Sequence, residues 1–246
     1  MQLALSSSAE AGEYLRTQNG IIIPIGSVEQ HGPIGAIGTD HLTSEFVARG
    51  VGDRIGAMVA PTLAYGMSQH HLSFPGSATL RPSTLMAVIC DVVESLAVHG
   101  FRRFFFINGH GGNVASGAAA FSELYARRSL GEASSAPRCR MLFWGSGPRT
   151  QALVKELYGD TEGSHATCSE VSLTQFCQPT TVRKAEMSPP VAPKSEGFFE
   201  AADYRARFPD GRIGSAPWKS SPEDGGRIYE TAVADMIEAY QAFLVY

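Results

Sequence analysis

The sequence IIIPIG at residues 21–26 and the sequence RRFFFI at residues 102–107 are short apolar runs, and each leads directly into a polar segment that contains glycine. β-Branched or aromatic runs that end in this way are typical of buried strands. Glu29 and His31 follow the first run, and His110 follows the second. We therefore predict two buried strands whose carboxyl ends lead into loops that carry carboxylate and imidazole side chains.

Strand and helix signals alternate on both sides of these runs. The apolar spacing predicts further strands at residues 58–63 and 139–144, and helices over about residues 9–17, 39–55, 82–100, 113–128, from near residue 165, and 227–244. Such alternation implies a mostly parallel sheet, and sites in such sheets lie beyond the carboxyl ends of the strands. We predict an α/β fold in one domain spanning residues 1–246.

Residues 178–226 form an irregular, proline-rich stretch, which we call the excursion. Its aromatic residues, among them Tyr204 and Trp218, are suited to anchor a long ordered segment. We expect the excursion to cover the site or a subunit contact. A shorter polar loop is predicted over residues 131–137.

The composition excludes some classes of partner. Lys and Arg total 20 against 24 Asp and Glu, a net charge of -4, so the chain lacks the basic stripe that nucleic acid binding requires. The sequence shows neither a basic, apolar leader nor an apolar run long enough for a membrane span, so we expect a soluble cytoplasmic protein. The four cysteines form no C-x-x-C pair and are expected to be reduced, with only Cys168 near the chemistry.

Glu29 and His31 are two positions apart, so both point to the same side of an extended backbone. His110 projects from a glycine-rich turn, and Asp40 is a short carboxylate able to bridge two ions. Each residue alone has an ordinary structural role, such as a turn or a helix N-terminus. Together, oxygen and imidazole donors without thiolate indicate a site for zinc, manganese or iron, and hence hydrolase chemistry.

Several motifs together resemble the creatininase family of amidohydrolases, with coverage from about residue 20 to 240. They are IPIGSVEQHGP at residues 23–33, GTD at 38–40, FPGS at 74–77 after His71, NGHGGN at 108–113, His165-Ala166 followed by Glu170-Val171-Ser172, and GSAP at 214–217 with Gly225.

This resemblance implies an α/β/α sandwich with two divalent ions per chain, zinc first, with manganese or iron as alternatives. It further implies hydrolysis of a non-peptide or cyclic C–N amide bond in a small-molecule substrate, by a homo-oligomer that is often a hexamer. Nucleic acid and membranes are not expected as partners.

The family carries a ligand Glu at the place of Gly112. We therefore expect the fifth ligand to be Glu170, which matches the Glu of another family motif. The predicted metal ligands are Glu29, His31, Asp40, His110 and Glu170. Departures at residues 34–36, Thr167 and Cys168 leave the substrate unassigned, and creatinine is not concluded.

The expected mechanism follows from these ligands. Two ions bridged by Asp40 would hold a water and lower its pKa toward about 7, and the resulting hydroxide would attack the amide carbonyl. Loop N–H groups of residues 109–112, with Gly111 placed at the substrate, would hold the oxyanion. His165 would donate a proton to the leaving nitrogen or clamp the substrate, His71 would bind substrate, and Glu170 would also belong to the catalytic set.

Other readings stay open at this point. Within the family, the chain could be a deformylase-type formamide hydrolase or a peptidase that trims a cofactor precursor. A phosphate or nucleotide binder could use residues 109–113, although G-x-x-x-x-G-K and G-x-G-x-x-G are both missing. The sequence has no G-x-S-x-G elbow of a serine hydrolase. A non-catalytic, metal-stabilised homologue is the remaining alternative.

Overall fold

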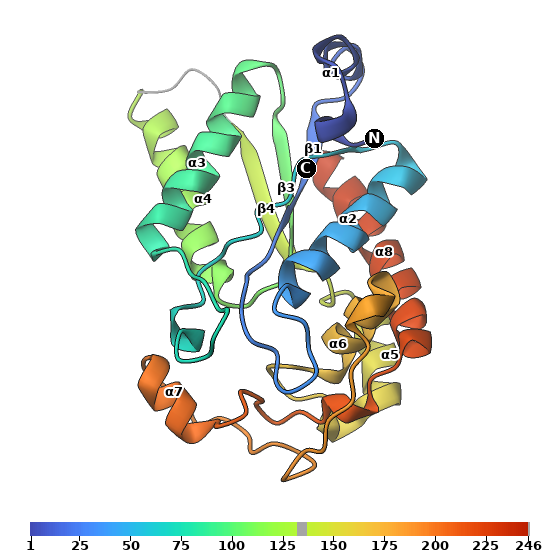
Figure 1. Ribbon diagram of the computed structural model, residues 1–246. Coiled ribbons are helices and arrows are strands. Elements are labelled where there is room, and N and C mark those ends of the chain that lie inside the picture. The colour runs from blue at the N-terminus through green and yellow to red at the C-terminus, as the bar shows by residue number, and fades with distance from the viewer. Residues whose placement is uncertain (132–136, 246) are drawn as a thin grey trace.

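The fold is described by a computed structural model for residues 1–131 and 137–245, so most of the polar loop predicted at 131–137 lies outside the described residues. The described strands form one parallel sheet in the order β2-β1-β3-β4 (Figure 1). Their bounds are β1 Gly20–Ile25, β2 Met58–Val59, β3 Arg103–Asn108 and β4 Arg138–Phe143. The predicted α/β fold with a parallel sheet is confirmed.

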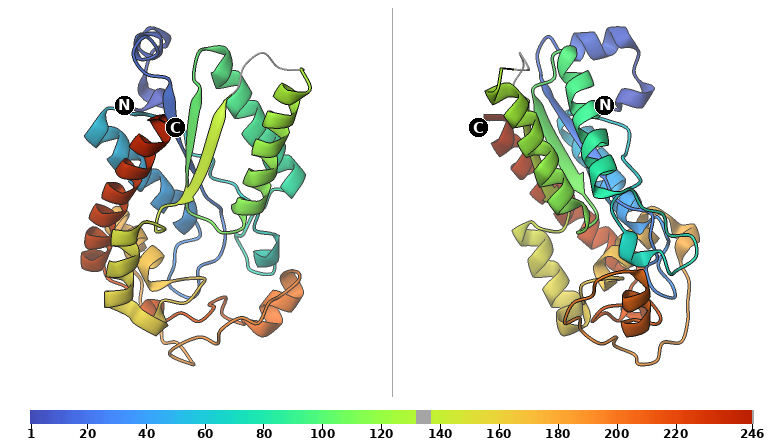
Figure 2. Two further views of the ribbon diagram at one scale, coloured as in Figure 1. Left: turned by 180° about the vertical axis from the view of Figure 1, so that it is seen from behind. Right: turned by 90° about the vertical axis from the view of Figure 1, so that its left-hand side faces the viewer.

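Helices cover both faces of this sheet (Figures 1 and 2). On one face lie α3 (Pro82–Val98) and α4 (Asn113–Ser129), and on the other lie α2 (Thr39–Ile55) and α8 (Pro222–Val245). Outside them, α5 (Pro148–Tyr158) and α6 (Cys168–Cys177) pack against α8. The shorter helices are α1 (Ser8–Tyr14), α7 (Ala201–Arg207) and the 3-10 turns Leu3–Leu5, Gln69–His71, Gly159–Thr161, Pro179–Thr181 and Pro217–Lys219.

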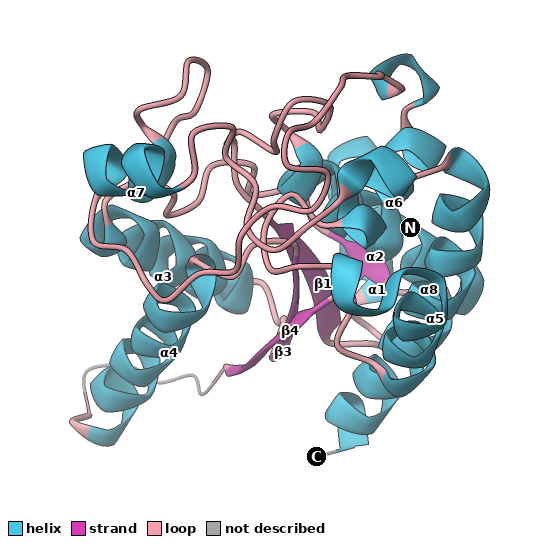
Figure 3. Cartoon of the chain, turned by 90° about the horizontal axis from the view of Figure 1, so that it is seen from below, coloured by secondary structure: helices cyan, strands magenta, loops and turns pink. Residues whose placement is uncertain are grey.

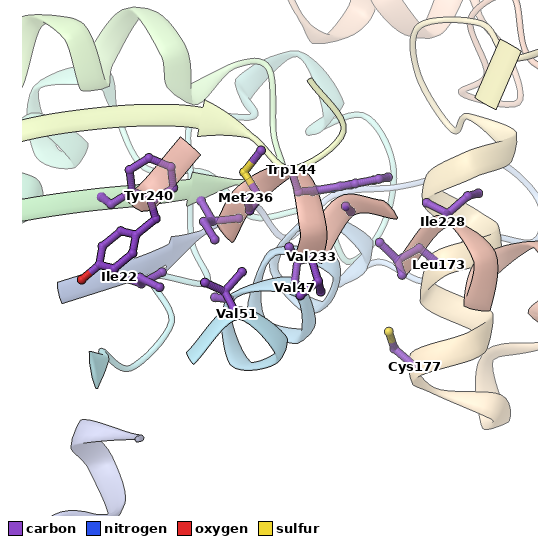
Figure 4. Packing of buried hydrophobic residues seen from close by; sticks show 14 of the residues in the cluster. Ile22, Val47, Val51, Trp144, Leu173, Cys177, Ile228, Val233, Met236 and Tyr240 are labelled. Atoms are coloured by element: carbon purple, nitrogen blue, oxygen red, sulfur yellow. The ribbon is translucent and has the colours of Figure 1, made fainter. Parts of the chain in front are cut away.

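The apolar run of β1 is buried on both sides because its residues alternate between two cores. Ile21 and Ile23 face the core under α3 and α4, whereas Ile22 faces the core under α2 and α8. Figure 4 shows Ile22 in the core under α2 and α8, with Val51 of α2 and Tyr240 of α8. Each such side chain stabilises the fold by roughly 1.5–3 kcal/mol relative to an exposed one. The sheet is therefore a rigid base for the loops at its edge.

Several elements differ from the sequence-based expectation. β2 stops at Val59 instead of residue 63, because Pro61 has no N–H for the ladder. α8 begins at Pro222 instead of residue 227, and the Ser221 hydroxyl accepts the Asp224 N–H at its start. α5 and α7 were not predicted at all. α5 begins with Pro148 and depends on a distant partner, since Asp235 of α8 accepts the Thr150 N–H.

Loops gather at the carboxyl ends of the strands (Figure 3). The excursion lies at this end too, and α7 packs beside the 3-10 turn that carries His71. In residues 1–131 and 137–245, no helix has both the length and the apolar character needed to cross a membrane.

The first turn of α2 rests directly on the ends of the two central strands. A Cβ added at Gly26, after β1, would lie 2.3 Å from the His41 backbone nitrogen, and one added at Gly109, after β3, would lie 2.0 Å from the Asp40 carbonyl oxygen. Only glycine allows this approach, because the opposing atoms are backbone and cannot rotate away. The contact places Asp40 between the two strand ends.

Gly109→Ala is expected to lower the free energy of unfolding by about 1–3 kcal/mol, as an overpacked core position does. Gly111→Ala is the matched control in the same loop, since a Cβ there meets nothing within 4 Å. Urea denaturation with a chelator present measures both without any contribution from bound metal. Equal midpoints for the two variants would contradict the tight contact.

Candidate metal centre

Five buried side chains from four separate elements meet at this edge of the sheet. Glu29 and His31 lie in the loop after β1, and His110 lies in the loop after β3. Asp40 occupies the first turn of α2, and Glu170 the first turn of α6. All five are at most 8% exposed, and these are the residues that the sequence predicted as metal ligands.

Asp40 lies at the centre of the cluster. Its Oδ1 is 3.0 Å from His31 Nε2, and its Oδ2 is 3.1 Å from His110 Nδ1. Glu29 Oε1 lies 3.3 Å from His110 Nδ1, and Glu170 Oε1 lies 3.7 Å from His31 Nε2. Two sets of ligand atoms thus form, Glu29–Asp40–His110 and His31–Asp40–Glu170, each with its atoms within 4.8 Å of one another. They share Asp40.

The two histidines are oriented by backbone carbonyls. His31 Nδ1–H donates to the Glu29 carbonyl oxygen at 3.1 Å, and His110 Nε2–H donates to the Met67 carbonyl oxygen at 2.9 Å. A carbonyl can only accept, so the other nitrogen of each ring faces the carboxylates and is the one left to bind either a proton or a metal ion. Histidines that ligate metals are held by such a bond on the nitrogen that does not bind.

A cation fits the donor atoms that the fold leaves without partners. In the described part of the chain, Glu29 Oε1, His31 Nε2 and Asp40 Oδ2 are buried and have no hydrogen bond, although each lies within about 3–4 Å of another ligand atom. A divalent ion with oxygen and nitrogen ligands would satisfy all three.

The electrostatics of the cluster also favour a cation. Burial opposes protonation of His31, but Asp40 and Glu170 outweigh it and raise its pKa to about 10. His110 likewise has a raised pKa, because Glu29 and Asp40 outweigh its burial. Burial raises the pKa of Glu170 to about 7, against the attraction of His31. Without metal, protons provide the positive charge that these carboxylates require, so metal and protons compete for the site.

Glu170 reaches the cluster because of how α6 begins. It forms a capping box with Thr167, whose N–H it accepts at 2.5 Å, and this fixes the carboxylate beside His31. Gly112, in contrast, has no room for a ligand side chain, because a Cβ there would lie 2.4 Å from both His110 Nε2 and the Met67 oxygen. A side chain at position 112 would collide with the bond that orients His110.

His71 and His165 form a wall above the cluster. Their rings are stacked 4.4 Å apart, with His71 Nε2 3.3 Å and His165 Nδ1 3.6 Å from Glu29 Oε1. Tyr204 of the excursion packs edge-on against His71 at 4.6 Å, and Gln30 contacts both imidazoles. Sequence reasoning missed Gln30, although its place between Glu29 and His31 could have indicated it.

A cavity of about 350 Å³ opens beside the cluster. Gly111 lies on its lining, as predicted for a substrate contact, together with the unpredicted Glu162 and the apolar side chains of Val114 and Phe143. Phe143 ends β4, so the strand-end rule could have found it. Cys168 lies between Thr167 and Ser169 of the lining, but its thiol is buried in the core and donates to the Ala216 carbonyl oxygen.

The chain matches the family model described as creatinine amidohydrolase over residues 4–240. Creatinine amidohydrolase of Pseudomonas putida is 38% identical over 95 residues, which are 37% of this chain and 36% of that protein. Mycofactocin precursor peptide peptidase of Mycolicibacterium smegmatis is 38% identical over 118 residues, which are 45% and 47% of the two chains. Each of these alignments thus spans less than half of the relative's length.

Solved structures match over nearly the whole chain. A mutant creatininase of type II superposes with a TM-score of 0.86 at 25% identity, covering 99% of this chain and 98% of that one. A mutant creatininase of Zn–Zn type and a creatininase described as the Mn form each give a TM-score of 0.84 at 26% identity, with 99% and 98% coverage. The three-layer arrangement is therefore that of the creatininases.

Asp40→Asn is expected to weaken binding of divalent metal more than about a hundredfold, because outer-shell changes alone cost 10–100-fold in affinity. Elemental analysis of protein purified without chelator, followed by titration with zinc, measures this. Asp53→Asn on the exposed part of the same helix is the matched control. Unchanged metal content in Asp40→Asn would contradict the ligand assignment.

In the metal-free protein, Glu170 is expected to contribute stability that is lost as the pH rises from 4.5 to 7. The raised pKa of Glu170 means that the folded state holds its proton more tightly than the unfolded state, so unfolding is favoured once the proton must leave. Urea denaturation in chelator over this range should show the free energy of unfolding of wild type falling relative to that of Glu170→Gln as the pH rises, with Asp53→Asn as the surface control. Parallel curves for wild type and Glu170→Gln would contradict the buried, protonated carboxyl.

Proposed function

The chain belongs to the creatininase family, and from this premise we propose that it is a metal-dependent amidohydrolase that cleaves a non-peptide or cyclic C–N amide bond in a small molecule. The observation that carries the proposal is the pair of ligand sets that share Asp40. A shared carboxylate is the arrangement that holds two divalent ions close together.

In this proposal Glu29, Asp40 and His110 hold one ion, and His31, Asp40 and Glu170 hold the other. Zinc is the first choice, with manganese or iron as alternatives, and the zinc and manganese forms of related creatininases support it. When bound, the ions would activate a water and polarise the amide carbonyl.

The loop after β3 provides the donors for the developing oxyanion. The Gly109 N–H is already used by the Ile25 carbonyl, and the His110 N–H by the Asn108 side chain. Of the N–H groups of residues 109–112 that the sequence indicated as oxyanion donors, those of Gly111 and Gly112 therefore remain. Gly111 lines the cavity, so its backbone can approach a substrate.

The histidine wall and the apolar side of the cavity would position the substrate. His165, Val114 and Phe143 all line the cavity, so both an imidazole and apolar side chains are available to a bound amide. The ring of His71 stacks on the ring of His165 and supports its position.

A cofactor-precursor peptidase is the second candidate, favoured by the similarity to the Mycolicibacterium smegmatis peptidase. A deformylase-type formamide hydrolase and a non-catalytic, metal-stabilised homologue are the further alternatives. The products separate them: formate marks a deformylase, a shortened peptide marks a peptidase, and no product with bound metal marks the inactive homologue.

We also propose that the chain forms a homo-oligomer, a hexamer by its family resemblance. The excursion presents large apolar side chains to solvent, such as Phe199 at 84% and Trp218 at 51% exposure, and an interface would cover them. Sedimentation of the metal-loaded protein tests this.

The metal-loaded protein is expected to hydrolyse at least one amide in a panel of cyclic amides, N-formyl amines and peptides, detected by release of an amine together with a carboxylate. His110→Ala should lower the rate at least about a hundredfold, because the variant lacks a proposed metal ligand. The fold should be kept, because the imidazole of a loop residue contributes little packing. His99→Ala, an exposed histidine at the end of α3, is the matched control. A His110→Ala variant with full activity would overturn the proposal.

A further inference from the structure

Gln30 is a buried amide, 7% exposed, that touches both rings of the histidine wall. Its Nε2 lies 2.9 Å from His71 Nδ1 and 2.9 Å from His165 Nε2. Because an imidazole nitrogen either donates or accepts according to its tautomer, these contacts decide where each ring carries its hydrogen.

Two backbone groups fix the orientation of the Gln30 amide. Its Oε1 accepts the Gly32 N–H at 2.8 Å, and its Nε2 donates to the Gly211 carbonyl oxygen at 3.0 Å. A backbone N–H can only donate and a carbonyl can only accept, so a flipped amide would lose both bonds. One Nε2 hydrogen then remains for the two imidazoles.

The hydrogen of His165 is placed by another carbonyl. His165 Nε2 lies 2.9 Å from the backbone oxygen of Gln30, which can only accept, so this nitrogen carries the hydrogen and donates it. It therefore cannot also accept from the Gln30 amide. The remaining amide hydrogen goes to His71 Nδ1, and His71 carries its own hydrogen on Nε2, facing Glu29 Oε1 at 3.3 Å.

We propose that Gln30 is a positioning residue that sets opposite roles for the two histidines: His71 carries its hydrogen on Nε2, on the side of Glu29, and His165 presents the lone pair of Nδ1 to the cavity and the ligand cluster. His165 forms with Glu29 and His31 a third group that could hold a metal ion, and its Nδ1 lies 3.6 Å from Glu29 Oε1, which agrees with a free lone pair there. The reaction role rests on the proposed function, whereas the tautomers do not.

These tautomers refine the expectation that His165 donates a proton to the leaving nitrogen or clamps the substrate. A neutral ring with its hydrogen bound to the Gln30 backbone has none to give to a leaving nitrogen, so His165 acts as an acceptor. It would first receive a proton on Nδ1 from the attacking water, and it could then pass this proton to the leaving nitrogen, so that the hydrolysis balances.

The excursion completes the arrangement through Gly211. A Cβ at Gly211 would lie within 2.6 Å of the Gln30 amide atoms, and its φ of 86° is a conformation that favours glycine. The Tyr204 hydroxyl donates to the same Gly211 carbonyl at 2.8 Å, and this ring packs against His71. Backbone of the excursion thus holds the amide against the two imidazoles.

Neutron diffraction of deuterated, zinc-loaded crystals locates the hydrogens directly. In wild type we expect deuterium on Nε2 of both His71 and His165, with both Nδ1 atoms bare. In Gln30→Glu, a carboxylate faces His71 Nδ1 and can only accept, so His71 should carry deuterium on Nδ1. In Gln30→Met, which cannot donate, His71 should no longer be fixed as the Nε2–H form, while the fold and the zinc content are kept.

Deuterium on His165 Nδ1 in wild type would overturn the assignment, as would an unchanged His71 in both variants. If amide hydrolysis has been found, both variants should lower kcat at least about tenfold, with Gln151→Met on exposed α5 as the control. An inactive wild type would contradict the proposed function alone, because the positions of the hydrogens are read without turnover. A wild-type kcat in both variants would overturn the positioning role.

Discussion

The close contact between the first turn of α2 and the ends of β1 and β3 determines the rest of the site. No side chain fits at Gly26 or Gly109, so helix backbone lies directly against strand-end backbone. Asp40 is thereby held between the loop that carries Glu29 and the loop that carries His110. A looser contact would separate three ligands that come from three different segments, and metal sites depend on ligand positions within a fraction of an ångström.

Bringing these ligands together buries more negative charge than the protein alone neutralises. Glu29, Asp40 and Glu170 surround the two candidate ligands His31 and His110, and two carboxylate oxygens, Glu29 Oε1 and Asp40 Oδ2, have no hydrogen bond among the described residues. Isolated carboxylates are expensive to bury unless they are paired, protonated or bound to metal. The raised pKa values of His31 and Glu170 are the response of the chain to this charge. Such local conflict in an otherwise well-packed fold is characteristic of a functional site.

The sequence predicted the parts of the structure that depend on local signals. The strands β1 and β3 and the helices α2, α3 and α4 lie within one or two residues of the expected ranges, because each has strong periodicity and a glycine or proline at an end. Glu29, His31 and His110 follow strand ends, so the fold rule already placed them at one edge of the sheet. Their roles as ligands stay predictions, as does the single domain.

What the sequence did not predict depends on partners far away along the chain. α5 needs Asp235 of α8 at its start, and the orientation of Gln30 needs the Gly211 carbonyl. Neither contact can be predicted from the helix or strand propensity of the residues nearby in the sequence. The family resemblance indicated Glu170, but the lack of room for a side chain at position 112 appears only where the His110–Met67 bond is seen.

The ligands and the histidine wall are supported by different parts of the molecule. The ligand carboxylates rest on the sheet and its helices, whereas the wall depends on the excursion, which has little regular structure. Arg212 compensates for this: it is fully buried, pairs with Asp210, and donates to the carbonyls of Pro189 and Ser215. The guanidinium therefore fixes the residues on both sides of Gly211. The Gly211 carbonyl, held in this way, in turn fixes the Gln30 amide. Changes in the excursion can then move the histidine wall while the geometry of the candidate ligands, held by the core, stays the same.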